Sequence, residues 1–245
     1  MSARRRTVAL ALVAATSATA ATCLALAGPA TAEYGTEITA ASIPAFSMGT
    51  ETSKTFTVTA AVTGADQVDF VLHGAAANCW RLWEYGDMRA DGAGRYSATF
   101  TITRAERDNA CAGTATLRIS AADSTGAHGW DDRDFPVLFQ RQSRFASYNF
   151  SPEPVRKGGT VTGVGAVQRA SWDDNAYHAI DRPPLAMQFR TLTGSYATVK
   201  TVTADSAGRV SSKATQSADG CWHWLFAGYS TTTPVTSTAD CVDSY

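Results

Sequence analysis

Apolar and polar residues alternate with a period of two along much of this chain, which predicts β-strands. The clearest example runs from Phe56 to Val62, where apolar residues alternate with threonines. The pattern recurs at 96–103, 115–121, 185–190 and 222–226, and the last segment places Trp222, Trp224 and Phe226 on one predicted core face. Successive side chains of a strand point to opposite faces, and threonine suits the wet face. The sequence therefore predicts an all-β protein of antiparallel sandwiches.

One eight-residue phrase occurs twice. Ala90–Ser97 (ADGAGRYS) and Ala204–Ser211 (ADSAGRVS) agree at six of eight positions. Each copy lies between alternating segments, and Gly94 and Gly208 are able to take the positive φ that a short hairpin loop requires. Both copies are therefore predicted hairpins, and their repetition predicts two copies of one domain.

The two halves divide at a polar stretch that lacks clear alternation, residues 140–147. We expect a first sandwich over 33–140 and a second over 148–245. The segment Ser151-Pro-Glu-Pro-Val155 opens the second domain, where its prolines suit an edge strand or an entry segment. Each half has enough residues for one small core.

Residues 1–32 have the features of a secretory signal peptide. Arg4 to Arg6 form a positive start, residues 8–27 are almost wholly apolar, and Ala30-Thr31-Ala32 supplies a small-x-small cleavage pattern. An uncleaved anchor helix is the alternative, because the apolar run is long enough to span a bilayer. The cleavage pattern favours a secreted, extracellular chain without a stable membrane span.

The remaining cysteines predict a disulfide framework. They are Cys79, Cys111, Cys221 and Cys241. An even number in an exported protein indicates two disulfides, and three pairings are possible. The preferred pairing is Cys79–Cys111 and Cys221–Cys241, since it keeps each bridge within one domain. Zinc ligation is the alternative, but no two cysteines have CxxC spacing.

Seven blocks of the second half occur in an order that resembles a known domain. They are Phe150–Gly158, Gln168–Asp174, Leu185–Arg190, Tyr196–Val202, Asp205–Gly208, Asp219–Trp222 and Ala239–Asp243. Together they resemble a domain common in secreted actinobacterial proteins. The resemblance implies an immunoglobulin-like β-sandwich in an extracellular protein and no enzyme activity. Cys221 and Cys241 depart from the pattern, and the first half resembles it only through strand order and the repeated phrase.

Two acidic clusters, each following a tryptophan, are candidates for a calcium site. They are Trp172–Asn175 and Trp130–Asp134, and neighbouring carboxylates are able to share a hard cation such as Ca²⁺. The preferred ligands are Asp173 and Asp174, because the resemblance covers them and some members of that family carry a calcium-binding label. The alternative is a solvated loop in which the aspartates cap turns. No other cofactor is expected.

An aromatic patch beside Cys79 is the candidate ligand-binding surface. It consists of Trp80, Trp83 and Tyr85, in a segment without clean alternation. Trp80 and Trp83 are spaced to present ring faces to a sugar or a peptide. The alternative is that one ring fills the core beside the disulfide, as a tryptophan does in immunoglobulin domains.

The sequence favours a binding protein over an enzyme. No GxSxG motif is present, and the four histidines lie in unrelated contexts. Removal of the three arginines of the predicted signal peptide would shift the formal net charge from −1 to −4, and this mildly acidic balance argues against nucleic acid as a partner. The prediction is a secreted, non-catalytic binding, adhesion or cell-envelope protein whose partner is an extracellular protein or a cell-wall or environmental polysaccharide. The alternative is an inhibitor of a protease or other hydrolase that presents a braced loop between Cys79 and Cys111; a secreted hydrolase comes third.

Overall fold

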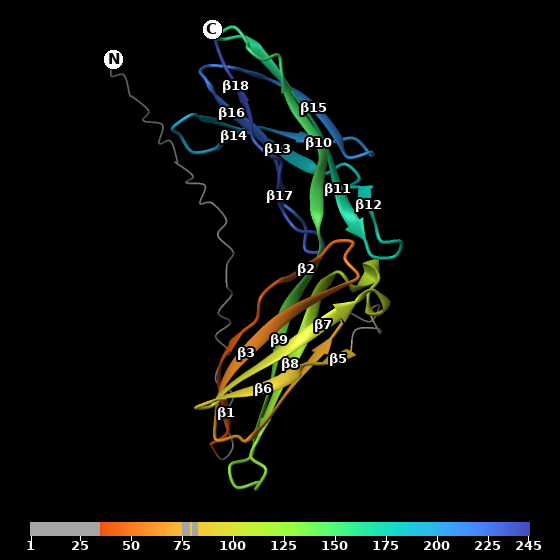
Figure 1. Cartoon of the computed structure of the whole chain (residues 1–245), viewed down its shortest axis with the longest axis vertical. Coiled ribbons are helices and arrows are strands. Elements are labelled where there is room, and N and C mark those ends of the chain that lie inside the picture. The colour runs from red at the N-terminus through yellow and green to blue at the C-terminus, as the bar shows by residue number, and fades with distance from the viewer. Residues whose placement is uncertain (1–34, 75–78, 80–82) are drawn as a thin grey trace, which may run out of the picture.

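The chain forms two β-sandwiches stacked end to end in the computed structural model, which describes residues 35–74, 79 and 83–245 (Figure 1). The predicted signal peptide, residues 1–32, lies outside the described residues. The C-terminus lies at the end of the second sandwich that is far from the first (Figure 1). The predicted all-β class with tandem sandwiches is confirmed.

The first sandwich has one sheet ordered β1-β3-β7-β6 and a second ordered β2-β9-β8-β4-β5. Its strands are β1 (Glu37–Ser42), β2 (Phe46–Met48), β3 (Ser53–Thr63), β4 (Gln67–His73), β5 (Trp83–Tyr85), β6 (Asp87–Gly92), β7 (Arg95–Thr103), β8 (Gly113–Ala122) and β9 (Trp130–Arg141). Two 3₁₀ turns, Arg104–Glu106 and Asn109–Cys111, lie between β7 and β8. The pairing is antiparallel except that β2 runs parallel to β9, because the chain crosses from one sheet to the other between β1 and β2.

Alternating residues fill the core of the first sandwich as the sequence predicts. The buried residues of β3 include Phe56 and Val58, while the threonines between them are exposed. The ring centroid of Phe56 on β3 lies 5.1 Å from that of Phe46 on β2 and 6.0 Å from that of Phe139 on β9. The two sheets are therefore joined by an aromatic layer that spans both inner faces.

The second sandwich also consists of two sheets. Its strands are β10 (Ser143–Ser151), β11 (Thr160–Ser171), β12 (Ala176–Ala179), β13 (Pro184–Thr191), β14 (Ala197–Thr203), β15 (Arg209–Thr215), β16 (Gly220–Phe226), β17 (Val235–Thr236) and β18 (Asp240–Val242). In one sheet, β11 pairs with β10, β12 and β15. The other sheet has the order β14-β13-β16-β17, with β18 also on β16.

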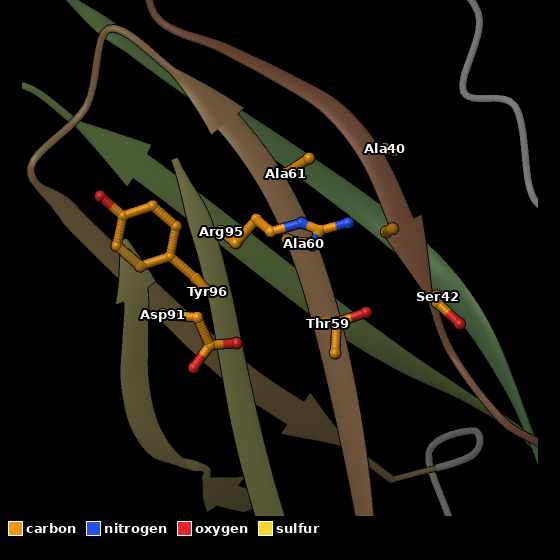
Figure 2. A pocket seen from close by; sticks show the side chains of 9 residues that line it. Ala40, Ser42, Thr59, Ala60, Ala61, Asp91, Arg95 and Tyr96 are labelled. Atoms are coloured by element: carbon orange, nitrogen blue, oxygen red, sulfur yellow. The ribbon is translucent and has the colours of Figure 1, made fainter. Parts of the chain in front are cut away.

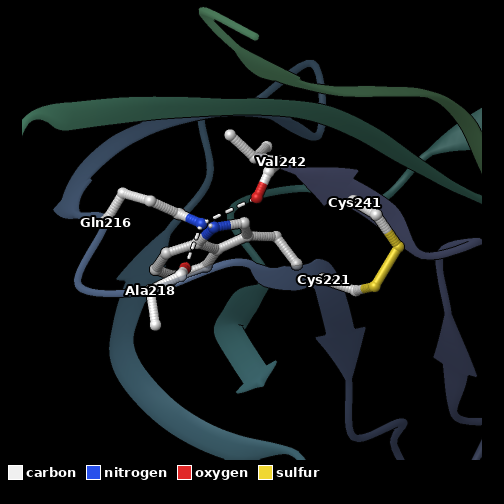
Figure 3. Close-up of a disulfide and its surroundings, with 6 residues drawn as sticks. Gln216, Ala218, Cys221, Cys241 and Val242 are labelled. Atoms are coloured by element: carbon white, nitrogen blue, oxygen red, sulfur yellow. Dashed lines mark hydrogen bonds between the residues drawn. A yellow bond between two sulfur atoms is a disulfide. The ribbon is translucent and has the colours of Figure 1, made fainter. Parts of the chain in front are cut away.

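Trp222 anchors the core of the second sandwich. Trp222, Trp224 and Phe226 are each at most 1% exposed, which confirms their predicted core position. The indole Nε1 of Trp222 donates to Gln216 Oε1 at 2.6 Å, and Gln216 Nε2 donates to the carbonyls of Ala218 and Val242 (Figure 3). The indole N–H is thus satisfied inside an apolar core.

Both disulfides pair the cysteines that the sequence analysis prefers. Cys79 bonds to Cys111, and Cys221 bonds to Cys241. The second bridge joins directly opposed residues of β16 and β18, so it fixes the last strand of the chain to a central one (Figure 3). Crosslinks of this kind restrict the unfolded chain and stabilise the folded one.

The repeated phrase forms a turn in both copies, but the turns differ in backbone conformation and connect different strands. In the first copy, Ala93 and Gly94 both have positive φ and close a hairpin between β6 and β7, as predicted. In the second copy, β14 pairs with β13 in one sheet while β15 pairs with β11 in the other. The predicted second hairpin is therefore wrong. The turn itself is kept by Asp205, whose Oδ1 accepts the N–H groups of Ala207 and Arg209.

The backbone passes between the sandwiches at Gln142. The Gln142 N–H donates to Met48 O of the first sandwich at 2.9 Å, and Gln142 O accepts from Ala170 N of the second at 2.8 Å. On the other side of β9, Arg141 exchanges backbone hydrogen bonds with Thr231 and Thr233. The strands β9 and β10 consequently follow one another without an intervening loop (Figure 1).

Trp172 belongs to the second half of the chain but packs in the core of the first sandwich. It is 2% exposed, and its Nε1 donates to Met48 O at 3.0 Å. The guanidinium of Arg107 lies 5.7 Å from the Trp172 ring centroid and donates to the carbonyl oxygens of Gly49 and Glu51. The two sandwiches therefore share a buried anchor as well as a continuous backbone.

Candidate functional site

The outer face of strands β3 and β7 carries four consecutive cross-strand pairs of hydroxyl side chains. The pairs are Ser53/Thr103, Thr55/Thr101, Thr57/Thr99 and Thr59/Ser97, and we call them the hydroxyl ladder. None of these side chains is buried, whereas the residues between them on β7 are. The ladder lies in the middle of its sheet, since β1 flanks β3 and β6 flanks β7.

Sheet geometry spaces the ladder regularly. Neighbouring strands lie about 4.8 Å apart, and residues on one face recur about every 6.7 Å along a strand. The hydroxyls of Thr57 and Thr99 are hydrogen-bonded to each other at 3.0 Å. A hydroxyl offers one donor and two acceptor positions, so each side chain in such a pair keeps capacity for a ligand. The surface thus presents a repeating two-dimensional array of hydrogen-bonding groups.

A hollow of about 420 Å³ lies at one end of the ladder (Figure 2). It is lined by Ala40, Ala41, Ser42, Thr59, Ala60, Ala61, Asp91, Arg95 and Tyr96. The register places Ala61 between Ala40 and Arg95, and the two short methyl side chains leave space beside the arginine. Arg95 and Asp91 come from the repeated phrase, so its first copy brings one charge of each sign to this hollow.

The equivalent face of the second sandwich has an interrupted ladder. Arg209 occupies the place of Arg95 in the phrase and pairs with Ala166, as Arg95 pairs with Ala61. Counting from these pairs, the next ones are Val164/Ser211, Thr162/Lys213 and Thr160/Thr215. Val164 and Lys213 therefore stand where the first sandwich has Thr59 and Thr99.

The predicted aromatic patch leads into this sheet. Trp80 lies outside the described residues. The backbone of Trp83 and Tyr85 forms β5, opposite His73 and Val71 of β4. Gly86 then connects β5 to β6, so the chain crosses here from one sheet of the sandwich to the edge of the ladder sheet. Ligand binding by this patch stays a prediction.

The predicted calcium ligands lie at the domain junction and have protein partners. Asp173 Oδ1 accepts the Asn109 N–H at 2.9 Å, and Asp173 Oδ2 accepts from Asn109 Nδ2 at 2.5 Å. Asp174 Oδ2 lies 2.5 Å from His178 Nε2, and hydrogen bonds from Ser171 and His178 lower the pKa of Asp174. Within the described ranges, no group of three or more His, Cys, Asp or Glu side chains is placed to hold a metal ion. Calcium binding stays a prediction.

The hydroxyl ladder was not singled out by sequence. Its threonines were visible as the wet face of alternating strands, but the cross-strand pairs join residues far apart in the chain, such as Thr57 and Thr99. The pairing needs the register of β3 against β7, and local periodicity does not contain it. Two aligned runs of Ser and Thr at alternate positions were the available signal.

No protein-family model and no curated protein matches this sequence. Solved structures with similar folds include a DUF4785 family protein from Legionella pneumophila, with 10% identity and a TM-score of 0.44 over 80% of this chain. The chain spans 56% of the length of that protein. The D0-D1 domain of intimin matches 81% of this chain and is itself covered to 94%, at 12% identity and a TM-score of 0.30. The I67-I69 fragment of the titin I-band matches 81%, with 61% of the fragment covered, at 10% identity and a TM-score of 0.34.

In the part of the chain that the structure describes, no helix has the length and apolar character needed to cross a membrane.

Proposed function

We propose that this chain is a secreted, non-catalytic binding protein that holds a polysaccharide of the cell wall or the environment on its hydroxyl ladder. The observation that carries the proposal is the run of four exposed Ser/Thr pairs in register on β3 and β7. The two disulfides support an extracellular location, because such bonds persist in oxidising compartments. A place in the secreted actinobacterial family that residues 150–245 resemble is part of the same proposal.

A polymer with recurring hydroxyl groups suits a regular array better than a small ligand does. Each hydrogen bond exchanged with water contributes only about 0.5–1.5 kcal/mol. A chain that engages several pairs at once adds these contributions, since the later contacts form within one complex. The outer face also changes little on binding, because its side chains stand on a paired sheet with a packed inner face.

The hollow beside Arg95 gives the ladder a distinct end. Arg95 supplies a guanidinium and Asp91 supplies a carboxylate beside a floor of alanine methyl groups. A polymer lying along β3 and β7 meets these charges at one end only. We infer that the surface distinguishes the two directions of a bound chain.

Retention on insoluble polysaccharide tests the proposal. The purified secreted protein is incubated with peptidoglycan, cellulose and chitin, and the apparent Kd is measured from the unbound fraction. The double variant Thr55→Val/Thr101→Val removes the hydroxyls of one pair and keeps the β-branched shape. We expect its Kd on the retaining polymer to rise about tenfold.

The second sandwich provides a matched control. Thr160 and Thr215 occupy the same register as Thr55 and Thr101, so Thr160→Val/Thr215→Val makes the same chemical change on the interrupted face. This variant is expected to keep the original Kd. Equal losses in the two variants, or no retention of the unaltered protein on any of the polymers, would contradict the proposal.

A further inference from the structure

Arg141 is a buried arginine whose Nε has no hydrogen-bond partner among the described residues. It ends β9 at the domain junction, where it continues the buried face formed by Val137 and Phe139. Arg141 is only 7% exposed, and its Nε is buried without a hydrogen bond. Arg107, the other buried arginine of the junction, also has an unpaired Nε, but its terminal nitrogens donate to Gly49 O and Glu51 O.

Arg141, Arg169 and Asp173 together form a net positive group, and Arg169 of β11 pairs with Ser143, two residues after Arg141. Burial and the positive charge of Arg169 lower the pKa of Arg141 to about 10, and Asp173 opposes part of that shift. Both carboxylate oxygens of Asp173 already accept hydrogen bonds from Asn109. The group thus contains two guanidinium ions and one carboxylate that is shared with a neighbouring amide.

A second buried polar atom lies close to Arg141. Thr232 is fully buried, pairs with Arg141 through an isolated parallel bridge, and has a hydroxyl without a hydrogen-bond partner. Buried polar groups in folded proteins are nearly always hydrogen-bonded, and an unpaired buried charge is costly. An arginine donor and a hydroxyl donor together complement an oxyanion, which the planar guanidinium binds through two parallel hydrogen bonds.

We propose that the junction between the two sandwiches is an oxyanion site in which Arg141 and Arg169 bind a carboxylate or phosphate group and Thr232 donates its hydroxyl. The bound group neutralises the repulsion between the two arginines. It lies between β9 of the first sandwich and β11 and the 227–234 loop of the second, so its binding stabilises their contact. The site is separate from the hydroxyl ladder and does not rest on the proposed function.

Thermal unfolding of the secreted two-domain protein tests the site. Sodium phosphate and sodium glucuronate are the probes, and sodium chloride at equal ionic strength is the reference. At roughly ten times its Kd, a bound anion is expected to raise the unfolding midpoint by about 3 °C. A response to phosphate alone identifies a phosphate site, and a response to glucuronate alone or to both identifies a carboxylate or general oxyanion site. No response to either probe overturns the proposal.

Substitutions locate the response. Arg141→Met removes the buried charge, so it is expected to abolish the anion response and to raise the midpoint in chloride alone. Arg169→Gln alters a half-buried side chain and is expected to reduce the shift of the unfolding midpoint by anion several-fold. This variant tests the oxyanion site even if Arg141→Met does not fold. Arg209→Gln, an exposed arginine of the same sandwich, is the control and keeps the full response. An unchanged response in Arg169→Gln would place the anion elsewhere and overturn the site.

Discussion

The two sandwiches use the same strand pair in the same register and present different outer faces with it. In both, an arginine of the repeated phrase pairs with an alanine, namely Arg95 with Ala61 and Arg209 with Ala166. In the first sandwich every following pair is Ser or Thr, whereas Val164 and Lys213 interrupt the second. The fold therefore does not require an unbroken hydroxyl ladder, and the first face is a property of its own sequence.

The other sheet of each sandwich, which contains β8 in the first and β16 in the second, differs in how much of its outer face is covered. On β8 of the first sandwich, buried residues alternate with exposed or half-buried ones, so its outer face is partly open to solvent. On β16 of the second, Cys221 and His223 are buried as well, beneath the disulfide to Cys241 and the ring of Tyr196. The second sandwich thus covers an outer face that the first leaves partly open.

The largest expected effect on stability tests whether the two sandwiches fold independently of each other. Trp172→Ala removes an indole that the second half places in the core of the first sandwich. We expect the free energy of unfolding to fall by about 3–5 kcal/mol, as for other buried aromatic truncations. Urea denaturation followed by fluorescence and circular dichroism measures the loss.

Trp130→Ala is the matched control for that variant. Trp130 is 66% exposed, so the same truncation is expected to change stability by no more than about 0.5 kcal/mol. A cost below about 1 kcal/mol for Trp172→Ala would show that the sandwiches fold without this anchor.

The next effect tests whether the two copies of the phrase are equivalent. Gly94 and Gly208 have positive φ, and a Cβ on either would lie 2.4 Å from the carbonyl oxygen of Val62 or Val167. We expect Gly94→Ala and Gly208→Ala to cost about 2–3 kcal/mol each in the free energy of unfolding. Gly92 has positive φ but nothing within 4 Å, so Gly92→Ala should cost only about 1 kcal/mol. Unequal costs at Gly94 and Gly208 would break the equivalence.

A smaller effect separates the sandwiches by pH. Burial, and then the charge of Arg190, lower the pKa of His223, whose Nε2 lies 2.6 Å from Gln188 Oε1. The unfolded chain binds the proton more readily, so stability is fully present above the ordinary histidine pKa and falls as pH drops from there through the folded pKa. We expect the urea midpoint of the second sandwich to decrease between about pH 7 and pH 5. His223→Gln should flatten this decrease, and an unchanged profile would assign it to another group.

Local pattern was enough to predict the clearest strands and their core residues, and the division into two domains favoured the observed cysteine pairing. Phe56, Val58 and Trp222 are buried where the period of two places them. The second predicted hairpin failed because Asp205 and Gly208 define a turn but not the sheet to which each flanking strand belongs. That choice is made by pairing of β14 with β13 and of β15 with β11.

Contacts between segments far apart in the chain could not be predicted from local sequence pattern. The sequence marks Trp172 only as the neighbour of two aspartates, yet its indole N–H donates to the Met48 carbonyl oxygen, 124 residues earlier. The hydroxyl ladder likewise depends on register, since a shift of one residue would turn its threonines to the core. Arg141 lies in a stretch that its composition predicts to be a polar boundary, and its burial results from packing by both sandwiches.

The smallest expected effect on stability is the sharpest test of the comparison. Val164→Thr and Lys213→Thr together complete the ladder of the second sandwich at two exposed positions. We expect a change in the free energy of unfolding within about 0.5 kcal/mol.

The reciprocal variant, Thr59→Val/Thr99→Lys, gives the first sandwich the interrupted pattern. If continuity of the hydroxyl pairs determines binding, the reciprocal variant loses polysaccharide retention, and the completed ladder restores it when both changes are combined. Retention that follows the first sandwich whatever its ladder would assign binding to the β5–β6 edge instead, because that edge is unaltered in both variants.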